Sequence, residues 1–333
     1  MGTYILRRVI QAIVILFGLS IVFFIILHLT PGGPCAGSEF GQGFAAVARE
    51  KACIQRLGIN QPLYVQYVKQ MGPYLHGDFG FSNSGDNIGS VILEKLPPTI
   101  LLLGVSYLVQ QLIALPLGIF AALRQYSLFD QVFTFLSYVG FSLPTFWFGL
   151  ILIFTFAVQI RWFPIGQVQS VNLPIFWTSG WFHALAHHPG LVLGDLALHL
   201  TLPALTLMVI GIAGDSRFMR ASMLDVLHQD YIRTAKAKGL SPARVVFKHA
   251  FRNAVLPIVT NIALFLPALV GGAVITETIF SWGGLGFLFI QSIQASDYPT
   301  LQALLMIGAL AVLIANLLAD ITYALVDPRI RYD

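Results

Sequence analysis

Residues 9–29 read VIQAIVILFGLSIVFFIILHL and contain no aspartate, glutamate, lysine or arginine. A helix that crosses a bilayer needs about 20 mostly apolar residues, so a stretch of this length is sufficient. It is also longer than the apolar region of a secretory signal peptide, which has about 7–15 residues. We therefore expect residues 9–29 to form a membrane helix that is retained in the protein.

The composition of the whole chain extends this interpretation. Hydrophobic residues make up 56% of the 333 positions and charged residues only 10%, whereas soluble domains carry about 25% charged residues. The formal charge of +4 is small, and the basic residues lie between long apolar segments instead of forming one basic patch. The sequence therefore predicts an all-α integral membrane protein in contact with lipid and without a nucleic-acid partner.

Long uncharged gaps locate the expected spans. A segment at 278–296 is too rich in glycine and polar residues to face lipid, and we interpret it as re-entrant or interfacial. Six transmembrane helices remain, at 9–29, 99–123, 131–158, 200–220, 255–276 and 300–326.

The distribution of basic residues predicts the orientation. With the N-terminus in the cytoplasm, 13 of the 19 lysines and arginines lie on the cytoplasmic side and 6 on the outer side. The excess agrees with the positive-inside rule and places both termini in the cytoplasm. The expected organisation is a cytoplasmic end and first helix at 1–30, a large extracytoplasmic loop at 31–97, and a core of five helices at 98–333.

The cytoplasmic loop 221–254 within this core has a recognisable local pattern. Helix-forming residues run from Asp230 to Lys238, and Gly239 supplies the left-handed position that often ends a helix. Ser241 is then a helix cap, with Pro242 at the first helical position. The pattern predicts a helix, a sharp bend and a second helix.

This loop resembles the signature of the inner-membrane permease subunits of ABC importers, in the dipeptide, oligopeptide and nickel branch. That signature reads E-A-A-x3-G and is followed by I-x-L-P. Here Arg233-Thr234-Ala235 and Gly239 occupy the first part, and residues 254–257 (Ala-Val-Leu-Pro) occupy the second. Arg and Thr replace the Glu and the first Ala, and the spacing from Gly239 to Pro257 is longer than the general pattern; both features are similar to the peptide branch.

The resemblance covers nearly the whole chain. Further motifs follow in the family's order at Tyr4–Arg8, His76–Ser82, Ser222–Leu227, Glu277–Trp282, Asp297–Pro299 and Asp327–Arg331. The resemblance implies a permease of the type I ABC importer architecture that forms half of a translocation pathway. It also implies a second homologous permease, two cytoplasmic ATPase subunits and an extracytoplasmic solute-binding protein as partners, in the cytoplasmic (inner) membrane of a bacterium or archaeon.

For individual residues, the resemblance implies that the cytoplasmic bend couples the permease to the ATPase. The residues expected in this role are Arg233, Thr234, Ala235, Lys236, Gly239, Leu240 and Pro257. Di- and oligopeptides are the expected solutes, and nickel and glutathione remain alternatives.

The residues themselves argue against an enzyme. A P-loop requires a lysine followed by Ser or Thr, and none of the six lysines has such a neighbour. Motifs of metalloproteases and serine hydrolases are also missing. We therefore expect no cofactor in this chain, with ATP and magnesium bound by partner subunits. A self-sufficient secondary transporter is the other alternative, but no internal repeat supports it.

We also make predictions for seven further residues. Cys35 and Cys53 lie on the expected outer side and are close enough in sequence to form a disulfide. Glu277 and Asp320 lie at ends of apolar spans, where acidic residues often line a pathway. The histidines at 183, 187 and 188 have no carboxylate before Asp195, and we expect no metal site there.

Overall fold

The computed structural model describes residues 2–29, 57–255 and 271–326, together with positions 51, 54, 55, 258 and 265. Side chains are described between positions 6 and 318 of these ranges. The described residues form helices and turns, and their β-pairing is limited to one bridge between Phe81 and Asn87. The expected all-α class is confirmed.

The chain forms two compact units, each discontinuous in sequence. The first comprises Met1–Ile100, Leu266–Thr278 and Gly283–Asp333. The second comprises Leu101–Phe265 and Ile279–Trp282. The C-terminal helix therefore belongs to the same unit as the N-terminal helix. A division of the chain into consecutive segments would not predict this pairing.

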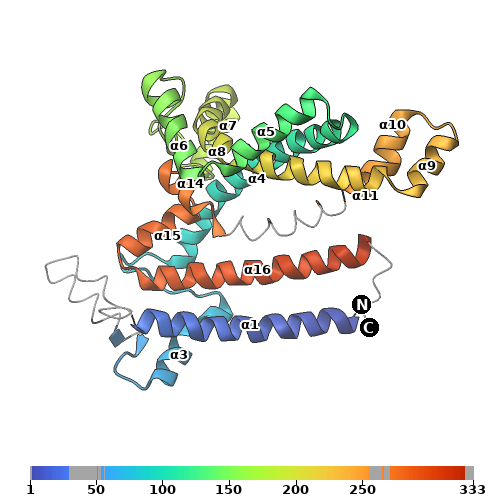
Figure 1. Cartoon of the computed structure of the whole chain (residues 1–333). Helices are drawn as coiled ribbons and strands as arrows, with labels where there is room; N and C mark the ends of the chain where they lie inside the picture. The colour runs from blue at the N-terminus through green and yellow to red at the C-terminus, as the bar shows by residue number, and fades with distance from the viewer. Residues whose placement is uncertain are drawn as a thin grey trace. The chain divides into compact units, whose positions relative to one another are not determined.

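In the first unit, α1 (Gly2–Leu29) and α16 (Tyr298–Val326) lie side by side (Figure 1). A short helix, α3 (Leu63–Met71), is attached to α1 by two hydrogen bonds. His28 Nε2 contacts Gln66 Oε1 at 3.0 Å, and the hydroxyls of Ser20 and Tyr67 are 2.6 Å apart. The remaining elements of this unit are η2 (Pro73–His76), the first residues of α4 (Ile88–Leu123), α14 (Val274–Ile279) and α15 (Leu285–Gln294).

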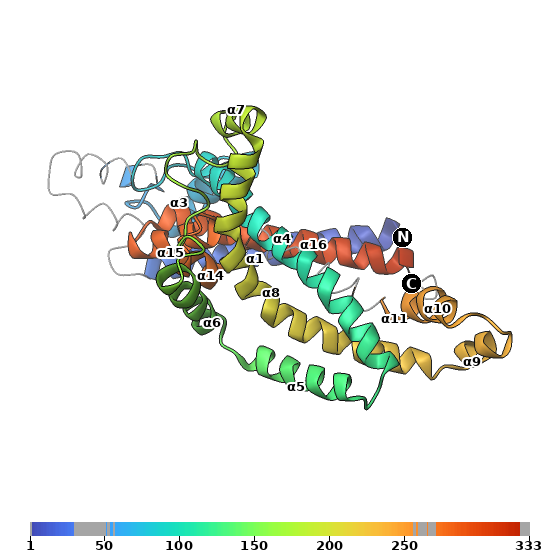
Figure 2. The same cartoon turned by 90° about the horizontal axis from the view of Figure 1, so that it is seen from above.

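In the second unit, α8 (Pro189–Leu227) is the longest helix, and α5 (Leu128–Ser142) runs beside it (Figure 2). The rest of α4 belongs to this unit. Also present are α6 (Thr145–Leu152), which continues into the π-helical η3 (Ile153–Gln159), and α7 (Ser179–His187). Beyond α8 the chain forms α9 (Asp230–Ala237), α10 (Pro242–Arg244), the π-helical η4 (Val245–Phe251) and α11 (Arg252–Ala254).

Four helices in the described residues are long and apolar enough to cross a membrane: Leu6–Leu29, Ile88–Leu123, Pro189–Leu227 and Tyr298–Leu318. They overlap the spans expected at 9–29, 99–123, 200–220 and 300–326, but the second begins 11 residues earlier than expected and the third extends beyond its expected span at both ends. The protein is therefore a multi-pass integral membrane protein. The span expected at 255–276 falls largely outside the described residues, so the count of six stays a prediction.

The span expected at 131–158 is not one straight helix. It consists of Leu128–Ser142 and Thr145–Gln159, which are bent by 97° relative to each other. The break lies at Leu143 and Pro144, where Leu143 has φ −73° and ψ 126°. A proline pushes the preceding residue out of the helical region and lacks the N–H that a continuous helix would use, so the sequence Leu-Pro interrupts the helix here.

The segment 278–296 contains no helix of spanning length. After α14, Ser281 and Gly283 have φ of 49° and 55°, and α15 has only 10 residues. Such a short helix cannot cross the hydrocarbon region alone. This geometry agrees with a re-entrant or interfacial segment, as the glycine content led us to expect.

Candidate functional site

The predicted bend after α9 is present, and its backbone forms a Schellman motif. Gly239 has φ 73°, its N–H donates to the carbonyl of Lys236 at 3.0 Å, and the N–H of Leu240 donates to the carbonyl of Ala235 at 3.4 Å. These two bonds satisfy carbonyls that the helix end would otherwise leave free. The left-handed φ explains why glycine occupies this position.

The second helix begins where the sequence predicted. Pro242 is its first residue, and Ser241 before it has an extended backbone. The side chain of Ser241 makes no capping hydrogen bond, so the expectation that it caps the helix through its hydroxyl is wrong. Proline at the first position needs no partner for an N–H, because it has none. The helix therefore starts through backbone geometry alone.

An apolar cluster attaches this bend to the ends of two long helices. Its buried residues are Ile119 and Ala122 of α4, Met219 and Met223 of α8, Ile232 and Ala235 of α9, and Val245, Val246, Ala250 and Ala254 of the second helix, with Ile258 beyond it. A hydrogen bond of 3.1 Å from Asn253 to the hydroxyl of Tyr231 adds a polar connection between α9 and α11. The bend and the helix ends therefore form one packed body.

The structure places the predicted coupling residues on different faces of the bend. Ala235 is buried in the apolar cluster, and Leu240 packs against it. Gly239 is exposed, and so are Arg233, Thr234 and Lys236. Arg233 lies 3.5 Å from Asp230 with both side chains largely in solvent, so this ion pair contributes little to stability. Pro257 lies outside the described residues.

Glu277 is completely enclosed. Its carboxylate accepts hydrogen bonds from the Thr99 hydroxyl at 3.0 Å and from the N–H groups of Ala273 at 3.2 Å and Phe287 at 3.1 Å. A Cβ added to Gly284 would lie 2.5 Å from the carboxylate. The carboxylate thus joins α14 to the N-terminal third of α4 and to the N-terminal turn of α15, where negative charge is favourable. This geometry favours a structural role.

Three other predicted residues cannot be placed. Cys35 and Cys53 lie outside the described residues. Asp320 lies on α16, but its side chain also lies outside the description.

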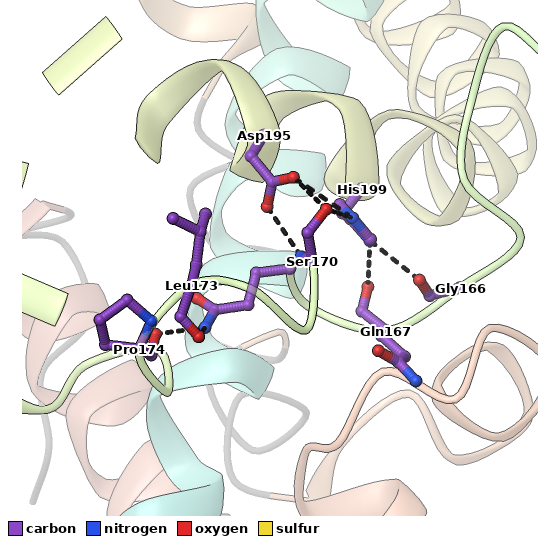
Figure 3. Close-up of polar contacts among 8 residues, drawn as sticks. Gly166, Gln167, Ser170, Leu173, Pro174, Asp195 and His199 are labelled. Carbon is purple, nitrogen blue, oxygen red and sulfur yellow. Dashed lines mark hydrogen bonds and ion pairs between the residues drawn. The ribbon is translucent and has the colours of Figure 1, made fainter. Parts of the chain in front are cut away.

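Ser170, Asp195 and His199 come together near the start of α8 (Figure 3). Asp195 accepts from the N–H of Ser170 at 2.9 Å and from its hydroxyl, and His199 Nε2 lies 3.4 Å from the same hydroxyl. The other ring nitrogen, Nδ1, faces the carbonyl of Gly166 at 2.8 Å. A catalytic triad needs the carboxylate at Nδ1 and the serine at Nε2. Here Ser170 and Asp195 both lie on the Nε2 side of the His199 ring. The three residues instead hold residues 166–170 against α8.

A polar cluster within the second unit was missed by the sequence analysis. Asp215 of α8 accepts hydrogen bonds from two amides of α4, those of Gln110 at 2.6 Å and Gln111. The span expected at 200–220 contains Asp215, but the sequence analysis gave this residue no role; α8 continues beyond it for twelve residues to Leu227. An acidic residue inside an apolar helix is itself a signal of function, and this rule would have identified Asp215.

Comparison with known proteins gives full-length matches. The family described as "Binding-protein-dependent transport system inner membrane component" matches residues 114–332, and its N-terminal companion family matches residues 1–102. The oligopeptide transport system permease protein AppB of Bacillus subtilis is 42% identical over 100% of both chains.

Two further relatives show a similar extent of likeness. The di/tripeptide transport system permease protein DppB of Pseudomonas aeruginosa is 38% identical over 100% of this chain and 99% of its own. The dipeptide transport system permease protein DppB of Escherichia coli K12 is 35% identical over 99% and 98%. In all three comparisons, the matched part of this chain includes the bend, Glu277 and Asp215.

Proposed function

The chain belongs to the family of binding-protein-dependent transport system inner membrane components, and on that basis we propose that it is the permease subunit of an ATP-driven peptide importer. The names of the three relatives support peptides as the solute, since they refer to oligopeptide, di/tripeptide and dipeptide transport. For the same reason, nickel and glutathione are less well supported as solutes. A family of transport components also agrees with the lack of enzyme motifs in the sequence.

We propose the following assembly around this chain. A second homologous permease completes the translocation pathway, and two cytoplasmic ATPase subunits bind ATP and magnesium. An extracytoplasmic protein captures the peptide and delivers it. The complex lies in the cytoplasmic membrane of a bacterium or archaeon, with both termini of this chain in the cytoplasm, because the excess of basic residues favours that orientation.

The bend between α9 and α10 is the proposed contact with the ATPase. The observation that carries this assignment is the apolar cluster, because it packs α9 against the ends of α4 and α8 in one body. A movement imposed on α9 would reach both long helices through contiguous contacts. Arg233, Thr234, Lys236 and Gly239 form the exposed side available to the ATPase, while Ala235 and Leu240 hold the bend from inside.

Uptake by proteoliposomes tests the proposed function. The importer is reconstituted with both permeases, the ATPases and the binding protein, and uptake of radiolabelled trialanine is followed. We expect uptake only with ATP and all partners present. Uptake by this chain alone along an ion gradient would instead indicate a secondary transporter. Replacing the binding protein with one of different peptide preference should change the preferred solute, since the spans offer few polar side chains.

Crosslinking tests the coupling contact. Single cysteines replace Thr234 or Lys238, both exposed on or directly after α9, in a chain whose Cys35 and Cys53 are serines. Each should crosslink to a cysteine in the ATPase groove. A cysteine at Leu75, which is 87% exposed in the other unit, is the matched control and should not crosslink. Failure of both α9 positions would reject the assignment.

A further inference from the structure

Asp215 carries a charge that the described part of the chain does not neutralise. The amides of Gln110 and Gln111 both donate to one carboxylate oxygen, Oδ2. Among the described residues, no lysine, arginine or histidine lies within 4.0 Å of this carboxylate. The second oxygen, Oδ1, receives no hydrogen bond from them either. The side chain is only half-buried, so Oδ1 is open to a further partner.

Asp215 lies within a long apolar helix, close to its expected cytoplasmic boundary. Gln111 lies twelve residues before the end of α4, and Asp215 lies twelve residues before the end of α8. Arg217 follows Asp215 by two residues and is one of the basic residues expected on the cytoplasmic side, so the cluster lies near the cytoplasmic end of the apolar part of α8. Both helices are long and apolar enough to cross a membrane. Acidic residues within apolar helices face a water-filled cavity or pair with a partner of opposite charge, and they mark substrate pathways.

The local packing holds the carboxylate in place. A Cβ on Gly211, one turn before Asp215, would overlap the amide of Gln110, so glycine leaves the room through which Gln110 reaches the carboxylate. Gly118 of α4 similarly allows close approach, because a Cβ there would lie 2.5 Å from the carbonyl oxygen of Ser216. Small residues of this kind let membrane helices approach closely. The site is therefore preorganised by both helices.

A second unpaired group in the cluster indicates the chemistry of the partner. The amide oxygen of Gln111 is buried and has no hydrogen-bond partner within the described residues. It belongs to the same amide whose nitrogen donates to Asp215. The cluster thus offers two acceptors, Asp215 Oδ1 and Gln111 Oε1, one negative charge, and the buried hydroxyl of Tyr107, which likewise has no hydrogen-bond partner among the described residues. A cation with several N–H donors fits this arrangement.

We propose that Asp215 and Gln111 bind the ammonium group of the transported solute, and this inference rests on the proposed function. An ammonium group has three N–H donors and one positive charge. Every peptide with a free N-terminus supplies such a group at neutral pH. A metal ion fits less well, because the described residues contain no group of three His, Cys, Asp or Glu side chains able to hold one. The pathway would therefore recognise the one end that all free peptides share.

A binding measurement on the assembled importer tests the inference without the solute-binding protein. The complex in nanodiscs is titrated with trialanine and with N-acetyl-trialanine, and half-saturation is read from saturation-transfer NMR. The chains compared are the natural one, Asp215→Asn, Asp215→Glu and Asp225→Asn. Asp225 is the matched control, because it is an exposed carboxylate on the same helix.

We expect the natural chain and Asp225→Asn to bind trialanine at least fivefold more tightly than N-acetyl-trialanine. Asp215→Asn should reduce this ratio to within twofold, and Asp215→Glu should keep most of it. Uptake of trialanine by the natural importer separately checks the proposed function.

Two results would overturn the inference while uptake is intact. The first is a natural importer that binds both peptides equally. The second is an unchanged ratio in Asp215→Asn. If Asp215→Asn instead separates from the second permease during gel filtration and no peptide preference exists in the natural complex, the carboxylate pairs with that subunit and not with the solute.

Discussion

At Gly239 the backbone conformation restricts which residue can occupy the position, whereas the space around it does not. The residue has φ 73°, and a Cβ added there would meet no atom within 4 Å. A substitution therefore acts through conformation alone. For residues other than glycine the left-handed region costs roughly 1–2 kcal/mol, with asparagine among the least affected.

We expect Gly239→Val to redirect the chain after α9 and to lower ATP-driven peptide uptake severalfold, because valine strongly disfavours the left-handed conformation. Gly239→Asn is the matched variant and should retain most of the uptake. Both should insert into the membrane and pair with the second permease. Equal uptake by the two variants would mean that the Schellman geometry is unimportant for coupling.

The enclosure of Glu277 leads to a second prediction at this scale. Glutamine at this position would turn an NH2 group towards N–H donors of the backbone, so at least one buried donor would lose its partner. Such a loss costs about 1–3 kcal/mol. We expect Glu277→Gln to lower thermal stability in detergent, while Glu94→Gln, on the exposed side of α4, leaves it unchanged. Reduced uptake at full stability would favour the pathway role instead.

Among the elements, α5 and α8 are joined by an ion pair whose geometry is bidentate. Arg220 Nε lies 2.6 Å from Asp130 Oδ1, and Arg220 Nη2 lies 2.7 Å from Oδ2. Asp130 is buried and also accepts from the N–H of Tyr126 at 3.0 Å. The carboxylate therefore fixes the connection between α4 and α5 as well as the contact with α8.

We expect Arg220→Lys to destabilise the protein by about 2 kcal/mol, because lysine cannot form both hydrogen bonds to the carboxylate. The change in the free energy of unfolding is measured by denaturation in detergent. Lys95→Gln removes an ion pair with Glu94 that is largely exposed, and it should have little effect. Unchanged stability in Arg220→Lys would show that Arg220 contributes only its charge.

Local signals account for what the sequence could predict at this scale. The bend could be predicted because Gly239 and Pro242 act on their own backbone. The burial of Ala235 could not, since it depends on Ile119 and Met219, which are distant in sequence. The helix break at Pro144 could also be predicted from the local Leu-Pro sequence, but locating spans by uncharged gaps takes no account of prolines. The contacts of Asp215 could not be predicted either, because the amides that donate to it come from another helix.

At the scale of the whole molecule, we predict that α5 and α6 with η3 together cross the membrane. Arg7 and Arg8 directly precede the apolar part of α1, and eight lysines and arginines lie between 217 and 254. The positive-inside rule predicts that both groups lie on the cytoplasmic side. They share one side only if the chain crosses an even number of times between them. With one crossing each by α1, α4 and α8, we therefore predict that the bent pair supplies a fourth.

This parity argument predicts that positions 126 and 171 lie on opposite sides of the membrane. Both are well exposed, at 78% and 87%, and they lie before and after the bent pair. In a chain whose own cysteines are serines, a cysteine replacing Tyr126 should react with a membrane-impermeant maleimide only in inside-out vesicles. A cysteine replacing Val171 should react only in right-side-out vesicles. Labelling of both from one side would make the bent pair re-entrant and would place Arg7 and α9 on opposite faces.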